Sequence, residues 1–129
     1  MNRAEEIMVA ANPSGLIGVD DDGATVMIED VADADGRLYR LEYRSTSDGA
    51  HAVAFCCHNP WGDVNGEEPF ESGHVDENGF ICLGPDHEGQ EIEDSPYDIA
   101  WVIQRARFWC TGFSVLKETG AFPDAAMNG

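Results

Sequence analysis

Three turn signals separated by β-rich segments constrain the fold of the first half of the chain more than any other feature. Each signal combines aspartate with glycine, at residues 20–23, 34–36 and 47–49. Asp-Gly pairs favour tight turns because both residues tolerate the backbone angles that such turns need. The segments beside these turns carry β-branched, aromatic or alternating residues; they are 16–19, 24–31, 37–44 and 51–57. The pattern predicts an antiparallel meander of three or four strands.

Two further segments frame this meander. Residues 2–10 have the composition of a short helix, which the Asn-Pro-Ser-Gly sequence at 12–15 would close. Residues 58–81 lose regular periodicity and are punctuated by proline and glycine. Irregular stretches of this length in a small domain are usually functional or tied down by side chains.

The last third of the chain predicts one long helix over residues 97–117. Ser95 is a good N-cap residue, and Pro96 suits the first helical position, where its missing N–H costs nothing. Apolar residues fall mainly on one side, so we expect this helix to pack on the sheet. Gly112 is expected to weaken or kink it, and residues 121–123 are expected to pack back on the core. The expected class is therefore α+β, with one domain spanning residues 1–129.

The charge of the chain excludes some partners. It has 25 acidic residues against seven basic ones, for a net charge of -18, and Lys117 is its single lysine. Nucleic-acid binding requires clustered Lys and Arg to neutralise phosphates, so we expect no nucleic-acid partner and no anionic membrane surface. An acidic surface attracts a basic partner, or it serves solubility or adaptation to a salty cytoplasm.

The cysteines and the N-terminus bear on the compartment. No signal-peptide pattern opens the chain, and no apolar run approaches the length of a membrane span, so a cytoplasmic protein is expected. In that setting the four cysteines are expected to be thiols; they are Cys56, Cys57, Cys82 and Cys110. Cys56 and Cys57 end a strand and should point to opposite faces, and Cys110 on the long helix should lie in the core.

One cysteine stands in a pattern of its own. Cys82 follows the Asn78-Gly79 turn by three residues and His74 by eight, between two aliphatic residues. Asn78-Gly79 predicts a tight turn that presents the thiol to a shallow groove, and Asn78 is expected to satisfy backbone groups there. A thiolate is both a nucleophile and a good leaving group, so cysteine can carry an acyl group without a metal or cofactor.

The block from Asn78 to Leu83, Asn-Gly-Phe-Ile-Cys-Leu, resembles the active-site signature of the ubiquitin-conjugating enzymes. Ser95-Pro96 resembles the start of the helix that follows it in that family, with Asp94 where tryptophan is usual. The order of helix, β-meander, irregular cysteine segment and Ser-Pro helix also agrees. His74 occupies the position of the asparagine that the family uses near the oxyanion. The His-Val pair and the C-terminal Thr-Gly-x-x-Pro look like the compact prokaryotic branch.

The resemblance implies a thioester-carrying transferase. Cys82 would accept the C-terminal acyl group of a ubiquitin-like protein from an activating enzyme and pass it to an acceptor protein. In an antiphage setting the donor would instead be a nucleotide second-messenger synthase. His74 is the expected auxiliary group, as hydrogen-bond donor or base. Asp86 and His87, a few residues past the thiol, are further candidates to orient or deprotonate an attacking amine. No cofactor is expected.

Three other functions stay open at this level. Cys56, Cys57, His58, His74 and Cys82 supply enough ligands for a zinc site, although adjacent cysteines lack the usual spacer. A non-catalytic binding module of the same fold would explain the missing asparagine. A hydrolase that uses Cys82 and His74 would need a third orienting group, which no motif supplies.

Overall fold

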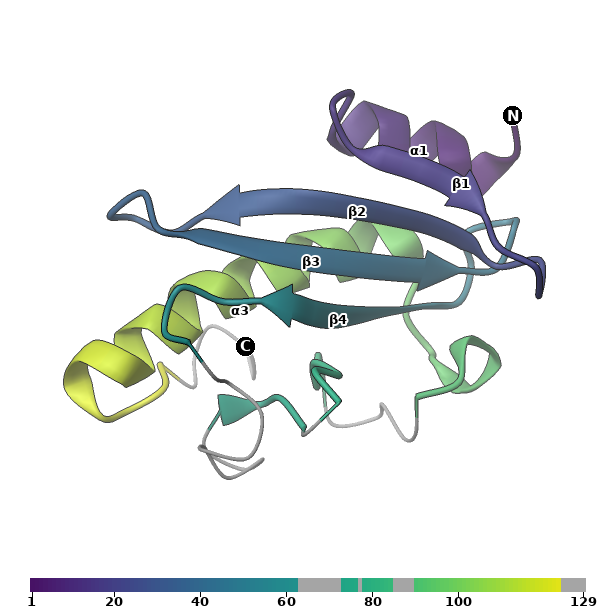
Figure 1. Cartoon of the computed structure of the whole chain (residues 1–129). Helices are drawn as coiled ribbons and strands as arrows, with labels where there is room; N and C mark the ends of the chain where they lie inside the picture. Colours follow the sequence, from purple (N-terminus) through teal and green to yellow (C-terminus); the bar gives the residue numbers. More distant parts are fainter. Residues whose placement is uncertain (63–72, 77, 85–89, 124–129) are drawn as a thin grey trace.

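The computed structural model describes residues 1–62, 73–76, 78–84 and 90–123. Helix α1 (Arg3–Ala11) precedes four strands, a single 3-10 turn η1 (Ile92–Asp94) and the long helix α3 (Ile99–Thr119) (Figure 1). The strands are β1 (Leu16–Val19), β2 (Thr25–Ala32), β3 (Leu38–Ser45) and β4 (Ala52–His58). They form one antiparallel sheet in the order β1-β2-β3-β4. The expected α+β class, with a helix, a four-strand meander and a C-terminal helix, is confirmed.

The three predicted turns form, and side-chain bonds hold them. In the first, Asp20 Oδ1 accepts hydrogen bonds from the backbone N–H groups of Asp22 and Ala24, each at 3.0 Å. Asp33 does the same for Asp35 and Arg37 in the second turn, each at 2.9 Å. All three turns place their glycine in the left-handed region. The first strand lies where it was expected, and the other three begin one residue later than the sequence indicated.

Helix α3 lies across one face of the sheet (Figure 1). Alternate residues of β3, namely Tyr39, Leu41 and Tyr43, are fully buried beneath it. The helix buries Trp109, whose ring meets Tyr39 edge-on at 5.7 Å between centroids. The predicted period-2 pattern of this strand and the core position of Cys110 are therefore both confirmed.

An ion pair between the buried Glu29 and the partly exposed Arg107, which the sequence does not predict, joins the two helices to the sheet. Glu29, on the inner face of β2, accepts hydrogen bonds from Arg107 of α3 at 2.7 and 3.0 Å. It also accepts one from the Tyr43 hydroxyl at 2.6 Å and one from Asn12 at 3.0 Å. Desolvation raises the pKa of Glu29, but these bonds outweigh it and the pKa is lowered. Arg107 also donates to the Ala11 carbonyl at 3.2 Å, where α1 ends.

Helix α3 begins later than predicted. Asp98, not Ser95, is its N-cap, and the Asp98 side chain accepts from Trp101 N at 2.9 Å. The segment before it is tied to the sheet instead, because Ala52 N donates to the Tyr97 carbonyl at 2.9 Å. The buried Ser95 uses its hydroxyl in a local turn, accepting from Tyr97 N at 3.2 Å. Tertiary bonds thus override a good local capping signal.

Gly112 does not interrupt α3, although glycine is a poor helix former. The helix runs unbroken through it, and a Cβ at this position would lie 2.5 Å from the Phe122 ring. Phe122 therefore packs against Gly112 where the chain turns back after the helix, as predicted for residues 121–123. Not every large apolar residue of α3 is buried: Phe108 is 52% exposed. Within the described residues, no helix has both the length and the apolar character needed to cross a membrane.

Candidate active site around Cys82

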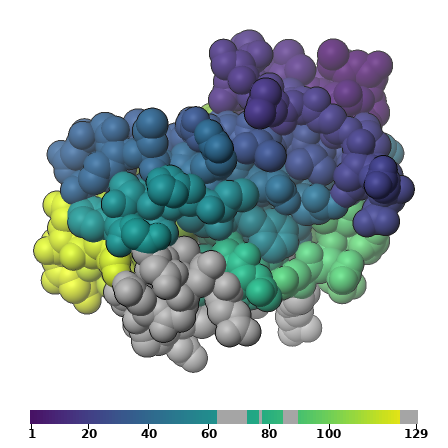
Figure 2. All heavy atoms as spheres, viewed as in Figure 1, coloured from purple at the N-terminus to yellow at the C-terminus, as the bar shows by residue number. Residues whose placement is uncertain are grey.

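The Cys82 segment lies along the outer edge of the sheet beside β4 (Figure 2). Ile81 N donates to the Ala54 carbonyl at 3.0 Å, and Phe80 forms a bridge with Phe55. Ile81 and Leu83 are fully buried, whereas Cys82 between them is partly exposed. Because successive residues of an extended chain point to opposite sides, burying both aliphatic neighbours turns the thiol outward.

The turn that precedes the thiol is organised by Asp76. Its Oδ1 accepts from Asn78 N at 2.8 Å and from Phe80 N at 3.0 Å. Its other oxygen accepts from Gln90 Nε2, which ties the far end of the loop to this turn. Asn78 is exposed, and the acceptor of these two backbone N–H bonds is Asp76; a role for the Asn78 side chain in this turn stays a prediction. An aspartate two residues before the N–H it bonds is a recognisable turn signal that the sequence analysis missed.

Gly79 brings the cysteine segment against β4. Cys56 N donates to the Gly79 carbonyl at 2.7 Å, and Gly79 has a φ of +82°. A Cβ at this residue would lie 2.4 Å from the Cys56 carbonyl oxygen. Only glycine combines the left-handed backbone with this approach. The Asn-Gly signal thus positions the thiol through close packing on β4 as well as through the turn.

His74 is next to Cys82 through its main chain. The His74 carbonyl accepts from Cys82 N at 2.8 Å, and His74 has a φ of +57°, in the left-handed region. Its half-buried ring meets the Phe122 ring at 4.6 Å between centroids. Trp109 of α3 donates to the Gly73 carbonyl at 2.7 Å and anchors the residue before it. The backbone next to the thiol is therefore held by the His74–Cys82 main-chain bond, by Phe122 and by Trp109 of α3.

Tyr97 is a further neighbour that sequence reasoning missed. A Cβ on Gly84 would lie 2.3 Å from the Tyr97 hydroxyl, so this hydroxyl lies against the backbone two residues past the thiol. The Gly84 carbonyl is itself 3.7 Å from Cys82 Sγ. Tyr97 stacks on Trp101 at 4.1 Å between ring centroids. The stacked pair of Tyr97 and Trp101 therefore lies beside the segment that carries the thiol, with the Tyr97 hydroxyl in contact with Gly84.

The other three cysteines differ from Cys82 in their surroundings. Burial raises the pKa of Cys56 to about 12, and burial also raises the pKa of Cys110. Cys57 faces out from β4, and its pKa is raised by desolvation and by the nearby Glu42 carboxylate. The prediction that Cys56 and Cys57 point to opposite faces is confirmed. Raised pKa values disfavour the thiolate, so these three positions are poorly suited to nucleophilic work.

Two of the expected site residues, Asp86 and His87, lie outside the described residues. The candidate zinc ligands are described, and they do not converge. Among the residues that the structure describes, no three His, Cys, Asp or Glu side chains group in a way that would hold a metal ion. The described site is therefore a braced, partly exposed thiol, with Asp76, the His74 main chain and Tyr97 as its neighbours.

Comparisons with known proteins add no relative. No protein-family model, no curated protein and no solved structure matches this chain. The likeness to ubiquitin-conjugating enzymes therefore rests on the residues at 78–83 and 95–96 and on the order of the elements.

Proposed function

We propose that this protein is a thioester-carrying acyl transferase with Cys82 as its nucleophile. One observation carries the proposal: Cys82 is turned outward between two buried aliphatic residues, on a backbone held by β4, His74 and Asp76. A structural cysteine is usually a small buried hydrophobic residue, whereas Cys82 is partly exposed. The motif at residues 78–83 supports the same conclusion, and the raised pKa values of Cys56, Cys57 and Cys110 disfavour those three thiols as nucleophiles.

The chemistry consists of two acyl transfers. The Cys82 thiolate attacks the carbonyl carbon of an activated donor, a new C–S bond forms, and the thiolate of the activating enzyme leaves. An acceptor amine then attacks the same carbonyl carbon. A C–N bond forms, Cys82 leaves as the thiolate, and the amine proton passes to a base. We assign the auxiliary role to His74, with Asp86 and His87 as further candidates for the base and Asn78 as part of the supporting turn.

The donor in this proposal is a ubiquitin-like protein, or a nucleotide second-messenger synthase, delivered by an activating enzyme in a bacterial conjugation or antiphage pathway. The acceptor is a second protein. The acidic surface favours partners that present basic residues near the transferred group.

Trapping of the covalent intermediate tests the proposal. The protein is incubated with a candidate donor, its activating enzyme and ATP, and analysed without reductant. We expect a higher-mass band that thiol removes, that Cys82→Ala abolishes and that Cys82→Ser converts to a thiol-resistant ester. Cys57→Ser is the matched control, because Cys57 is the other thiol on the surface, and this variant should load normally.

Three outcomes would contradict the assignment. A band that persists in Cys82→Ala would show that another residue is the nucleophile. Absence of any adduct, with a donor shown to load its activating enzyme and with this protein shown to be folded, would favour the non-catalytic binding module. Stoichiometric zinc in the purified protein would favour a metal site instead.

A further inference from the structure

One stretch of β2 has a strand neighbour on one side only. The ladder between β1 and β2 runs from Val19↔Thr25 to Leu16↔Ile28 and stops there. The ladder between β2 and β3 continues to Ala32↔Leu38. Within the described chain, residues 29–32 therefore pair with β3 alone, and Figure 1 shows β2 extending past the short β1. Such an edge presents backbone N–H and C=O groups to which another strand can bond.

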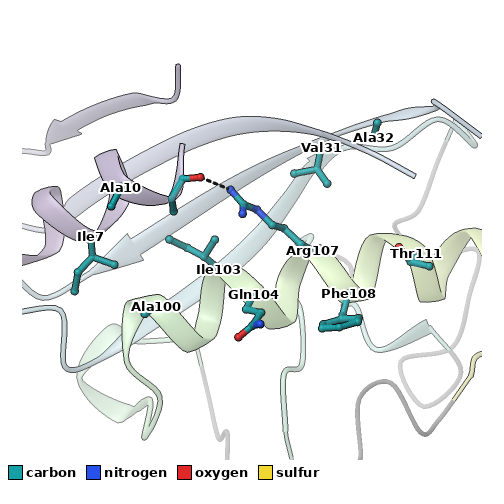
Figure 3. A pocket seen from close by; sticks show the side chains of 11 residues that line it. Ile7, Ala10, Val31, Ala32, Ala100, Ile103, Gln104, Arg107, Phe108 and Thr111 are labelled. Carbon is teal, nitrogen blue, oxygen red and sulfur yellow. Dashed lines mark hydrogen bonds between the residues drawn. The ribbon is translucent and has the colours of Figure 1, made fainter. Parts of the chain in front are cut away.

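An apolar groove lies on the inner side of this edge. It has a volume of about 650 Å³ and runs between α1, the end of β2 and α3 (Figure 3). Val31 lines it from the strand and Ile103 from the helix. Arg107 is the one charged residue among the described residues that line it, and Glu29 already neutralises it. Although the chain has 25 acidic residues, none of the described residues that line this groove carries a carboxylate, so it suits a large uncharged side chain.

A second hollow lies on the outer side of the same edge. Its volume is about 340 Å³, and its lining includes Ile28, Asp30 and Arg40. Asp30 and Arg40 form an ion pair at 2.9 Å with both side chains about half exposed. Successive side chains of a strand point to opposite faces. A strand added beside residues 29–32 would therefore place one side chain in the inner groove and the next beside Asp30.

We propose that residues 29–32 of β2 receive an extended segment of a basic partner protein by strand addition. Main-chain bonds to the open edge would supply affinity, and the two hollows would select a large apolar side chain alternating with a basic or polar one. A second copy of this chain is a poor occupant, because each copy carries a charge of -18 and the two repel. A docked helix would leave the open backbone groups of β2 without strand partners.

The test is selection from a displayed library of random dodecapeptides on the purified full-length protein. We expect enriched peptides that alternate apolar with basic or polar residues. Ala10→Trp, which fills the groove from an exposed site on α1, should weaken their binding at least tenfold. Val9→Trp is the matched control on the same helix, since Val9 does not line the groove, and it should bind like wild type.

The amide resonances of residues 30–32 should shift when a selected peptide is added. Ala100→Trp, on the opposite wall, provides the same test if Ala10→Trp does not fold. Three results would overturn the proposal: no enrichment over the groove-filled variant, selected peptides with helical periodicity, or resonance shifts confined to the Cys82 segment. Concentration-dependent dimerisation lost in Ala10→Trp would assign the edge to a second copy instead. None of these readouts depends on thioester formation.

Discussion

At the scale of single residues, the position of the thiol follows from what surrounds it. Ile81 and Leu83 lose all exposure to solvent, and this burial sets the orientation of Cys82 between them. Gly79 permits the approach to β4, and Asp76 holds the turn that leads to it. The sequence marked the Asn-Gly turn, but the contact of Gly79 with the Cys56 carbonyl is visible only in three dimensions.

Gly79→Ala should destabilise the protein by about 2 kcal/mol or more, because it combines a left-handed backbone with a steric clash. Gly23→Ala is the matched control: Gly23 has a similar φ of +87°, but a Cβ there meets nothing within 4 Å. That substitution should cost about 1 kcal/mol. Urea denaturation of both variants measures the difference. Equal losses would show that the contact with β4 does not constrain the thiol segment.

At the scale of the elements, α3 has two features, its start and its glycine, that local sequence preferences predict incorrectly. Its start is shifted to Asp98 because the residues before it are bonded to β4 and to the preceding turn. Its glycine serves packing: Phe122 lies against Gly112 and also meets the ring of His74. Helix α3 therefore supports the cysteine segment in two ways. Trp109 donates to the Gly73 carbonyl, and Phe122, which packs on α3, contacts the ring of His74.

Gly112→Ala tests the packing of Phe122 on α3. Helix propensity alone predicts a gain of about 1 kcal/mol, whereas the clash with Phe122 predicts a loss of stability. We expect the loss in the wild-type background and its reversal in a Phe122→Ala background. A thermodynamic cycle from the four melting curves isolates the coupling. A gain of stability in both backgrounds would show that Phe122 does not pack against Gly112.

At the scale of the whole molecule, buried carboxylates join the layers of an otherwise acidic protein. Glu29 bonds to Arg107 across the sheet–helix interface, and Asp33 bonds to Arg37 and to Ser114 of α3. Desolvation raises the pKa of Asp33, but the bonds from Ser114 and Arg37 outweigh it and lower the pKa to about 2. Both carboxylates therefore stabilise the fold in their ionised form.

The low pKa of Asp33 fixes the pH dependence of its contribution. An unfolded aspartate has a pKa of 3.8, so the stabilisation is fully present above that value and is lost as pH falls toward 2. Asp33→Asn should be less stable than wild type at pH 7, and the gap should shrink between pH 4 and pH 2. Asp22→Asn, at an exposed turn residue, is the control and should follow wild type. Chemical denaturation at several pH values measures both; a gap independent of pH would contradict the assignment.

By itself, the sequence determined the element order, the three turns, the alternating strands and the segment that bears the thiol. These follow from local spacing and backbone preference, which a chain carries wherever it folds. Only the tertiary structure decided that α3 begins at Asp98, that Phe122 packs against Gly112, and that Glu29 pairs with Arg107. Each depends on contacts between separate segments of the chain, and the energy of such contacts is set by burial and approach distance, which no local pattern encodes.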